Sequence, residues 1–536
     1  MANTNQNKNA SDPLTKTVLR NALLILLMLA YPLLGIIWHH DYPFFSAEVS
    51  LLLGLCAISA LILASVLKFV GTAVSNLVLC VILLLVFLIH FNLFFLGLLA
   101  TFITTLAVSM LFRRHFPDLL LVVMLALIAG KFVDSHLDRS RFTPEVSGTA
   151  SEPTKGPLIH ILLDGFIGLD GLPNLPEAGG VKSDIIAFFE HWEFEVYARA
   201  YSHYGATLDS MTRALNFRND SANMFQRAHA LRQELAFPQN AWFQALKEDG
   251  YPLVVYQTDS VNFCDEETGS VAICKTYPIP NLNSLHEGLE NPVTRAKVIF
   301  KTLLAQSTLI TKLQIDARTL KTWGISTYEP RMLVDLASDV PQAPGNAFFA
   351  HILMPHDPLV YREDCSLDYS IDSADRYSFV ITGQKNTTEQ RVPRYKNYVA
   401  QLRCALNALG AVFTAMQDAG LYEQATIVVH GDHGSSASLV NPSVRNMDLL
   451  NYRDLREVYS TLFAVRFPDS RFELIDDTLS LNVLMAKTLL RLTGRDAQSL
   501  GVEVLEEDEP FIYLNGVEPL QQMYVDIFTR PNPESE

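Results

Sequence analysis

The apolar residues of the chain are concentrated in its first quarter, in four runs that hold few or no charges: residues 18–38, 51–67, 69–112 and 118–133. A bilayer core takes about 20 helical residues, so the run 69–112 is long enough for two crossings, with a turn at His90 and Asn92. The pattern therefore predicts five transmembrane helices. A cleaved signal peptide is the alternative for the first run, but further apolar segments follow it and no small-residue cleavage site is evident.

The positions of the basic residues predict the orientation of these helices. They lie before the first run, after the second, and between the fourth and fifth helices: Lys8, Lys16, Arg20, Lys68, Arg113 and Arg114. The connection 38–48 contains no Lys or Arg. Because cytoplasmic loops carry an excess of these residues, the N-terminus is predicted inside and everything after residue 134 outside the cytoplasm.

Beyond residue 156 the pattern changes to short apolar runs separated by amphipathic segments. Four runs are typical of buried strands: 157–163, 252–256, 347–353 and 425–429. Three segments are typical of helices: 183–191, 240–249 and 398–419. Strands that alternate with helices predict an α/β domain with a mostly parallel, doubly wound sheet, whose active site lies beyond the carboxyl ends of the strands. The predicted organisation is a transmembrane domain (1–134), a polar linker (135–156), an extracytoplasmic catalytic domain (157–530) and a disordered tail (531–536).

The composition agrees with this division and excludes two classes of protein. With 49% hydrophobic and 18% charged residues and a mean hydropathy of +0.17, the chain is not wholly soluble. Its net charge of −16 and pI of about 5.3 exclude a general nucleic-acid binder, because neutralising phosphates needs a basic face. Residues 1–134 carry a net charge of +2 and the remainder −18, so the acidity belongs to the exported part, where solubility is its simplest explanation.

Cysteine usage agrees with export. Cys56 and Cys80 lie in apolar runs, and four more cysteines lie in the predicted extracytoplasmic domain: Cys264, Cys274, Cys365 and Cys404. An even number in a domain that faces an oxidising compartment indicates disulfides. Of the three possible connectivities we favour Cys264–Cys274 with Cys365–Cys404. A zinc site made of these cysteines is disfavoured because no Cys-x-x-Cys spacing occurs.

Two polar clusters in the first half of the domain are candidates for chemistry. Asp164 ends the run 157–163, where an acidic side chain can hold a cation, although a loop Asp that caps a helix is commoner. Thr207 follows a glycine and precedes a predicted helix in the segment 201–210. Backbone N–H groups and the dipole at a helix start favour an anion, and a helix N-cap is the structural alternative.

Two histidine-containing clusters follow later strands. His351 falls inside the run 347–353 and can be an ordinary core histidine, whereas His356 lies in the following loop and is the better functional candidate. The run 425–429 leads into His-Gly-Asp-His-Gly, in which glycines bracket Asp432 and His433. An adjacent carboxylate and imidazole at a strand end suit a first-row divalent metal, zinc above all. This is the most specific signal in the chain.

Together the four clusters resemble the alkaline phosphatase/sulfatase superfamily. They are similar in particular to its membrane-anchored branch, which includes lipoteichoic acid synthases, phosphoethanolamine transferases and glucan phosphoglycerol transferases. The motifs occur in the family's order: Asp164 after a strand, His203-Tyr-x-x-Thr-x-x-Ser210, Met354-Pro-His-Asp-Pro358 and Asp432-His433-Gly434. The resemblance implies a multi-span anchor, often of five helices, followed by a sulfatase-like domain outside the cytoplasm.

The resemblance also implies roles for the residues at the strand ends. Asp164, Thr207, Asp432 and His433 would bind one catalytic divalent metal, expected to be Zn²⁺, with Mn²⁺ or Mg²⁺ as alternatives. Thr207 would be the nucleophile, activated by coordination. It would attack the phosphorus of a phospholipid, release diacylglycerol and form a phosphothreonine ester.

The remaining roles concern the substrate. His356 would steady the phosphoryl oxygens or protonate the leaving group, and His351 and Ser210 would join it as substrate-binding residues. The Cys/Ser-x-Pro-x-Arg motif of type I sulfatases does not occur near Thr207, which disfavours sulfate-ester hydrolysis. The chain contains no histidine after His433, which disfavours a two-zinc phosphatase.

These features predict a metal-dependent transferase that moves a phospholipid headgroup, phosphoglycerol or phosphoethanolamine, onto an envelope glycan. Its partners would be a phospholipid donor, a glycan acceptor and the membrane, but not nucleic acid. The predicted location is the inner membrane of a bacterium, with the catalytic domain in the periplasm. The alternatives are an extracytoplasmic hydrolase of phosphodiesters or sulfate esters and an envelope-assembly protein with a vestigial site. A transporter is disfavoured because the spans hold few charges.

The segment 294–323 carries six basic residues among apolar ones. One interpretation is an interfacial helix that rests on anionic lipid headgroups. The simpler interpretation, which we favour from sequence, is an ordinary amphipathic surface helix.

Overall fold

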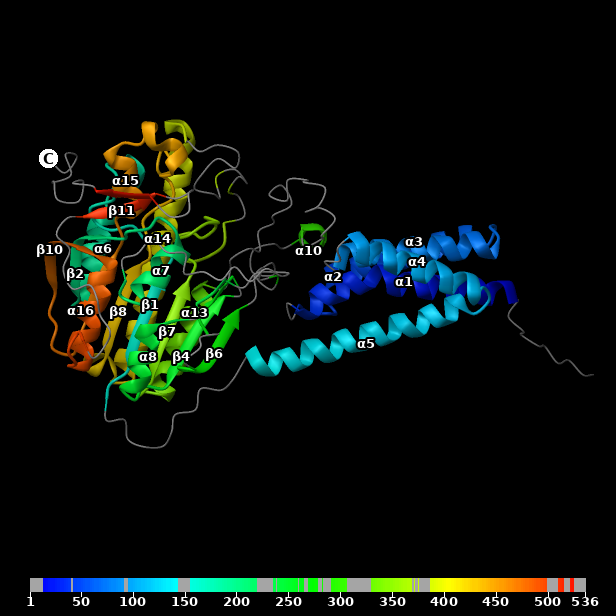
Figure 1. Ribbon diagram of the computed structural model, residues 1–536, viewed down its shortest axis with the longest axis horizontal. Helices are drawn as coiled ribbons and strands as arrows, with labels where there is room; N and C mark the ends of the chain where they lie inside the picture. Colours follow the sequence, from blue (N-terminus) through cyan, green and yellow to red (C-terminus); the bar gives the residue numbers. More distant parts are fainter. Residues whose placement is uncertain are drawn as a thin grey trace, which may run out of the picture. The chain divides into compact units, whose positions relative to one another are not determined.

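The computed structural model (Figure 1) describes residues 13–39, 42–90, 95–142, 155–218, 235–237, 239–258, 260–264, 269–277, 282, 291–305, 329–368, 371, 375, 386–498, 510–514 and 521–524. The chain divides into two compact units. The helical unit consists of residues 1–141 and 282–324, and the sheet unit of residues 142–281 and 325–536.

Five successive helices form most of the helical unit: α1 (Pro13–His39), α2 (Ala47–Leu67), α3 (Thr72–His90), α4 (Phe95–Leu111) and α5 (Phe116–Phe142). This confirms the predicted number. By length and hydropathy, residues 15–38, 47–67 and 116–133 can each cross a membrane, and the apolar described parts of α3 and α4 are shorter. Asn92, at the predicted turn, lies outside the described residues. The core is formed by α1, with α2, α3 and α5 packed around Leu24, Ile25 and Met28.

One later helix, α10 (Pro292–Ala305), belongs to the helical unit and packs on α1 and α2. The structure therefore groups part of the predicted catalytic segment 157–530 with the N-terminal helices. Similarly, α5 continues to Phe142, eight residues into the predicted linker 135–156. Residues 143–154, 306–328 and 525–536 lie outside the described residues, so the rest of the linker, most of the basic segment 294–323 and the predicted tail are not described.

The sheet unit is built on eight strands in the order β10-β2-β9-β8-β1-β7-β4-β6. Their bounds are β1 (Leu158–Leu163), β2 (Glu195–Tyr201), β4 (Leu253–Thr258), β6 (Val271–Tyr277), β7 (Ala347–Ile352), β8 (Thr426–Gly431), β9 (Phe463–Arg466) and β10 (Glu473–Ser480). All pairs are parallel except those of β9, which is antiparallel to both its neighbours. The four predicted strands are β1, β4, β7 and β8, and every residue in them is buried, as expected for parallel strands covered on both faces.

Helices cover both faces of this sheet (Figure 1). The helices α7 (Thr207–Ala214), α8 (Ala241–Glu248) and α16 (Leu481–Thr493) pack on one face in a core that includes Trp242 and Phe349. The opposite face carries α6 (Val181–His191), α13 (Glu329–Asp339) and α14 (Thr388–Asp418), which contact one another through pairs such as Phe188–Phe413. The predicted doubly wound α/β architecture, preceded by a helical N-terminal unit, is confirmed.

The helix α14 is also long and apolar enough to cross a membrane by length and hydropathy alone. It belongs to the sheet unit, and its buried arginines Arg391 and Arg394 bond to Glu457 and Asn386 there. It begins ten residues before the predicted helix 398–419, because Thr387 and Gln390 form a capping box at its start.

Shorter elements complete the sheet unit. They are α15 (Tyr452–Tyr459), the hairpin β11 (Phe511–Leu514) and β12 (Gln521–Tyr524), the pair β3 (Leu235–Ala236) and β5 (Val261–Asn262), and the 3₁₀ turns η1 (Pro176–Ala178), η3 (Val340–Gln342), η4 (Tyr422–Gln424) and η5 (Val444–Leu449). Two disulfides, Cys264–Cys274 and Cys365–Cys404, confirm the favoured pairing. Cys56 and Cys80 are free.

Candidate active site

The site lies where three neighbouring parallel strands end. Strand β1 pairs with β8 on one side and β7 on the other, and Leu163 lies in register with both Gly431 and Ile352. The residues that follow these strands therefore meet at one edge of the sheet. Asp164 comes from the end of β1, and Asp432 and His433 come from the end of β8.

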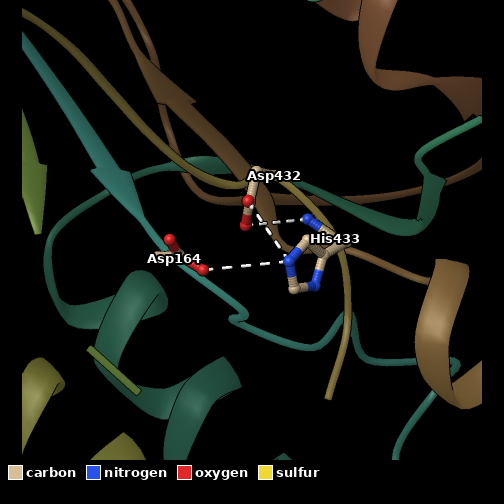
Figure 2. Close-up of side chains that lie close together, drawn as sticks. All are labelled: Asp164, Asp432 and His433. Atoms are coloured by element: carbon tan, nitrogen blue, oxygen red, sulfur yellow. Dashed lines mark hydrogen bonds and ion pairs between the residues drawn. The ribbon is translucent and has the colours of Figure 1, made fainter. Parts of the chain in front are cut away.

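Asp164, Asp432 and His433 form a buried cluster in which one ligand atom from each lies within 4.8 Å of the others (Figure 2). The His433 Nε2 atom is 3.3 Å from Asp432 Oδ2 and 3.8 Å from Asp164 Oδ1. His433 Nδ1 lies 2.8 Å from the carbonyl oxygen of Gly434. Donation to that carbonyl places the proton on Nδ1 and leaves the Nε2 lone pair directed at the carboxylates, as in a metal-binding histidine.

The carboxylate oxygens that face His433 fit a metal ion. Asp432 Oδ1 accepts hydrogen bonds from the backbone N–H groups of Gly165 (2.8 Å) and His433 (2.9 Å). Asp432 Oδ2 and Asp164 Oδ1, in contrast, are buried without a hydrogen-bond partner. Buried charged oxygens are paired or coordinate metals, so two such atoms beside a free imidazole nitrogen are the donor set of a divalent cation.

Electrostatics in the cluster point the same way. Burial opposes ionisation of Asp164, but the neighbouring histidines, His356 first among them, hold its pKa below the usual range. Burial and the nearby charge of Asp164 raise the pKa of Asp432. Two carboxylates this close repel each other when both are ionised, and a bound cation would favour the ionised form of both.

Thr207 is the first residue of α7, and its hydroxyl donates a hydrogen bond to Asp164 Oδ2 at 3.1 Å. The residue before the helix is Ala206, and no side chain caps it. The N-cap alternative for Thr207 is therefore wrong. The hydroxyl lies beside the carboxylate cluster and at a helix N-terminus, where the N–H groups and the dipole favour a phosphate.

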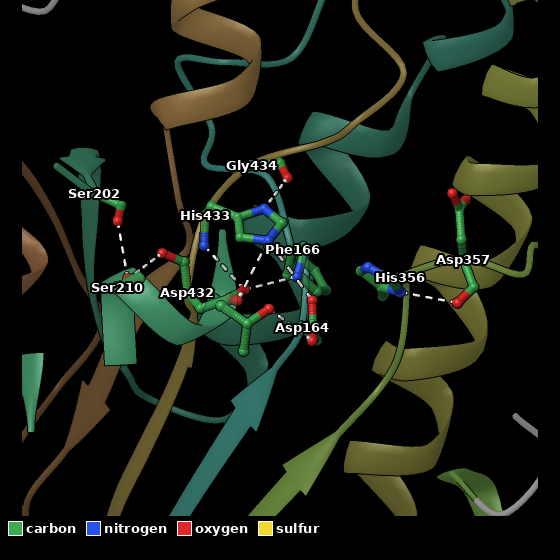
Figure 3. A network of polar contacts seen from close by, with 12 residues as sticks. Asp164, Phe166, Ser202, Ser210, His356, Asp357, Asp432, His433 and Gly434 are labelled. Carbon is green, nitrogen blue, oxygen red and sulfur yellow. Dashed lines mark hydrogen bonds and ion pairs between the residues drawn. The ribbon is translucent and has the colours of Figure 1, made fainter. Parts of the chain in front are cut away.

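Ser210, one turn later in α7, supports the cluster from behind (Figure 3). Its hydroxyl donates to the carbonyl oxygen of Asp432 at 2.7 Å and lies 3.0 Å from the hydroxyl of Ser202. His351, in β7, is completely buried, and its Nε2 lies 3.3 Å from Asp164 Oδ2. The substrate-binding role predicted for Ser210 and His351 stays a prediction, and the structure places both in contact with residues of the cluster.

His356 lies on the opposite side of Asp164 from His433 and is half-buried (Figure 3). Its Nδ1 lies 2.8 Å from the carbonyl oxygen of Asp357, which leaves Nε2 available. Burial lowers the pKa of His356, but Asp164, Asp357 and Asp432 outweigh it and raise this pKa to about 9. The imidazole is therefore cationic at neutral pH and can donate a proton.

Two residues that support the site carried no signal in the sequence. Tyr398, from the middle of α14, donates to the carbonyl oxygen of Gly165 at 2.7 Å and accepts from the N–H of Ile167 at 3.1 Å, which holds the turn after Asp164. Glu457, from α15, accepts from the Ser435 hydroxyl at 3.1 Å and pairs with Arg391. Both come from segments distant in sequence, so spacing could not reveal them.

Glu457 predicts a pH dependence of stability. Burial raises its pKa to about 7 despite the opposing effects of Arg391 and Ser435. The folded protein thus binds this proton more tightly than the unfolded chain, so the stabilisation is complete below the unfolded pKa of about 4.5 and is lost as the pH rises through about 7. Relative to Glu457→Gln, the wild type should lose up to about 3 kcal/mol in unfolding free energy over this range.

The measurement is the apparent melting temperature of the detergent-purified chain across this pH range. Glu190→Gln, an exposed glutamate on α6, is the control and should keep the wild-type slope. Equal slopes for Glu457→Gln and the wild type would contradict the prediction.

Gly434 allows the closest backbone approach in the site. A Cβ atom at this position would lie 2.1 Å from the carbonyl oxygen of Glu457 and 2.5 Å from that of Ser460. Because both obstacles are backbone atoms, Gly434→Ala should displace the His433 loop and destabilise the fold by about 3 kcal/mol or more. Gly410→Ala, whose Cβ would lie 3.6 Å from Phe188 in mid-helix, should instead stabilise by about 0.5–1 kcal/mol. Thermal unfolding of the two variants tests the contrast, and equal melting temperatures would refute it.

No protein-family model and no curated protein matches the sequence. Several solved structures are similar. They include the C-terminal periplasmic domain of EcEptC from Escherichia coli in complex with Zn (14% identity, TM-score 0.41, 72% of this chain and 97% of that one) and the phosphonate monoester hydrolase SpPMH from Silicibacter pomeroyi (15% identity, TM-score 0.39, 68% and 81%). A third is a protein in the alkaline phosphatase superfamily from Vibrio parahaemolyticus (13% identity, TM-score 0.37, 70% and 80%).

These similar structures include a member of the superfamily that the motifs of the sequence resemble. Identities and TM-scores are low, so any functional proposal for this chain depends on its own side chains.

Proposed function

We propose that this protein is a membrane-anchored phosphotransferase that moves a phospholipid headgroup, phosphoglycerol or phosphoethanolamine, onto a glycan of the bacterial envelope. One observation carries the proposal: the Thr207 hydroxyl, at the start of α7, lies 3.1 Å from a carboxylate of a buried cluster that fits a divalent metal. A hydroxyl held beside a base and a cation site is suited to nucleophilic attack. The helix start next to it suits a phosphate.

Four residues would hold the metal in this proposal: Asp164, Thr207, Asp432 and His433. Zn²⁺ is the expected ion because it accepts mixed imidazole and carboxylate ligands, with Mn²⁺ or Mg²⁺ as alternatives. When bound, the ion would withdraw charge from the phosphoryl oxygens and lower the pKa of the Thr207 hydroxyl.

In the first step the Thr207 oxygen forms a bond to phosphorus while the bond from phosphorus to the diacylglycerol oxygen breaks. Asp164 Oδ2, which already accepts the hydroxyl hydrogen of Thr207, receives the proton. His356, cationic at neutral pH, donates a proton to the departing oxygen. The products are diacylglycerol and a phosphothreonine ester.

In the second step a glycan hydroxyl attacks the same phosphorus. Its proton passes to His356, which is now neutral, and the Thr207 oxygen departs with the proton held by Asp164. The headgroup is then attached to the glycan, and all three residues return to their starting state. With water in place of the glycan hydroxyl the step becomes hydrolysis, so the acceptor decides between a transferase and a hydrolase.

The proposed location follows from the charge pattern and the helical unit. Three segments of α1, α2 and α5 are long and apolar enough to span a bilayer, and the basic residues favour a cytoplasmic N-terminus. The sheet unit would then lie in the periplasm of a bacterium, anchored to the inner membrane. A lipid donor and a membrane anchor fit together because the donor lies in the surface to which the enzyme is attached.

The test uses the full chain in liposomes of phosphatidylglycerol and phosphatidylethanolamine that carry labelled headgroups, with Zn²⁺ and with or without a soluble glucan. We expect diacylglycerol to accumulate and the label to move to the glucan. Thr212→Ala, which removes a hydroxyl bonded within α7, is the matched control and should remain active. Release of free headgroup without glucan would replace the transferase by a hydrolase. Absence of diacylglycerol from metal-loaded protein would overturn lipid-donor chemistry.

A further inference from the structure

Helix α10 is attached to the helical unit by an apolar face. Val298 and Ile299 on α10, with Leu282 before it, are buried in a cluster with residues of α1, α2 and their connection: Leu33, Ile36, Ile37, Tyr42 and Val49. These partners belong to the last turns of α1 and the first turn of α2. The helix therefore docks at the end of two apolar spans.

A buried polar contact anchors α10 at this position. The Arg295 guanidinium lies 3.0 Å from Glu48 Oε2, and the Tyr42 hydroxyl bonds to the other oxygen of the same carboxylate. The Glu48 side chain is fully buried and that of Arg295 is 12% exposed. A pair this well covered is costly to break, so α10 is held against the connection between α1 and α2.

The opposite face of α10 is exposed and has two different edges. At 100° per residue, Val293 and Phe300 fall along one edge and Lys297 and Lys301 along the other, and all four side chains are exposed. The helix contains no acidic residue. An apolar edge beside a basic edge is the pattern of a helix that lies in the headgroup region, with its apolar side chains at the acyl boundary and its lysines at the phosphates.

The lysines are placed as an anion-binding pair. Lys297 and Lys301 are four residues apart and therefore neighbours on the helix surface, where like charges repel. Neither makes an ion pair with any residue that the structure describes. A phosphate between them would convert this repulsion into attraction.

The surroundings of α10 continue the lipid-facing surface of the spans. In the connection that α10 contacts, Phe45 is 93% exposed, and α2 exposes Leu51, Leu55, Ile58 and Ile62 along its length. Exposed apolar side chains in a row on an apolar span face lipid. The α10 face thus joins a membrane-contacting surface at its headgroup end.

We infer that α10 is an interfacial helix that binds the phosphate of an anionic phospholipid between Lys297 and Lys301. In the proposed topology this lipid lies in the outer leaflet, the one that would supply the donor. The inference rests on the membrane anchor of the proposed function and not on the chemistry at Thr207. Failure of the lipid site and failure of the phosphotransfer are therefore separate results.

The first experiment measures lipid selectivity. The full chain is reconstituted in phosphatidylcholine bilayers with a minority of phosphatidylglycerol, extracted in detergent, and its bound lipids are counted by native mass spectrometry. The variant K297Q/K301Q should lose about 30-fold in preference for phosphatidylglycerol, from about fivefold for each lysine. The matched control K182Q/K396Q removes two exposed lysines of the sheet unit and should retain the preference. An unchanged preference in K297Q/K301Q would overturn the inference.

The second experiment measures depth and does not depend on a lysine variant. A nitroxide at Phe300→Cys, in a background with Cys56 and Cys80 replaced by alanine, should be more accessible to oxygen than to a water-soluble nickel complex. A label at Asp184→Cys, on exposed α6 of the sheet unit, should show the reverse. If the two labels behave alike in bilayers, α10 does not lie in the interface.

Discussion

Thr207→Ala is expected to abolish the covalent headgroup adduct and to lower turnover by about 10³-fold or more, the effect of removing a nucleophile. The hydroxyl is the only part of this side chain that reaches Asp164 Oδ2, at 3.1 Å, so alanine removes the reacting atom and leaves α7 in place. The measurement is intact-protein mass spectrometry after incubation with mixed phospholipids. A metal-dependent mass increase in the wild type should identify the headgroup, and the variant should show none.

Two variants separate loss of the nucleophile from loss of the helix. Thr207→Ser keeps a hydroxyl at the same position and should still form the adduct. Thr212→Ala removes a hydroxyl that bonds to the Leu208 carbonyl within α7 and should behave as the wild type. An adduct that persists in Thr207→Ala, with zinc bound, would mean that another residue is the nucleophile.

Asp432→Asn should have opposite effects on the metal-loaded and the metal-free protein. Asn can still accept the two backbone N–H bonds that Asp432 receives from Gly165 and His433. Its amide nitrogen replaces Oδ2, the buried oxygen that has no hydrogen-bond partner. We expect metal affinity to fall by about 100-fold or more, which removes about 2.7 kcal/mol of ligand-induced stabilisation at metal concentrations near 100 times the wild-type Kd.

Without metal the same substitution should raise the melting temperature, because it removes the repulsion between the carboxylates of Asp164 and Asp432. The measurements are metal content by mass spectrometry and thermal unfolding with and without a chelator. Asp184→Asn, on the surface of α6, is the control and should change neither. Equal metal content in wild type and Asp432→Asn would contradict a cation at this cluster. Absence of metal from wild type after metal-replete expression would favour a vestigial site.

The residues of the cluster could be found from sequence because each directly follows a recognisable strand. Strand β1 and strand β8 are continuous apolar runs, and Asp164 and Asp432 are the polar residues at their ends. Parallel strands bring their carboxyl ends to one edge, so the strand pattern alone placed these side chains together. The sequence did not reveal that β1 lies between β8 and β7, and this order is what brings His351 within 3.3 Å of Asp164.

Other features were beyond reach of the pattern because their partners are far apart in the chain. Strand β10 is largely exposed and polar, so no apolar run announces it. His160 and His430 lie on neighbouring strands with their Nε2 atoms 2.7 Å apart, and burial holds the pKa of both below the usual range. Tyr398 reaches the turn after Asp164 from a helix 230 residues later in the chain.

The sequence by itself determined the five N-terminal helices, the buried strands, both disulfide pairs and the polar residues at the strand ends. These depend on local periodicity, on composition and on residue type, which neighbouring residues along the chain record. The tertiary structure decided the strand order, the contacts of His351 and Tyr398, and the membership of α10. The amphipathic pattern of α10 fits a surface helix and an interfacial helix equally well, because a moment shows that one face is buried and not what covers it. Only the packing of Val298 and Ile299 against α1 and α2, with Arg295 paired to Glu48, places this helix in the helical unit.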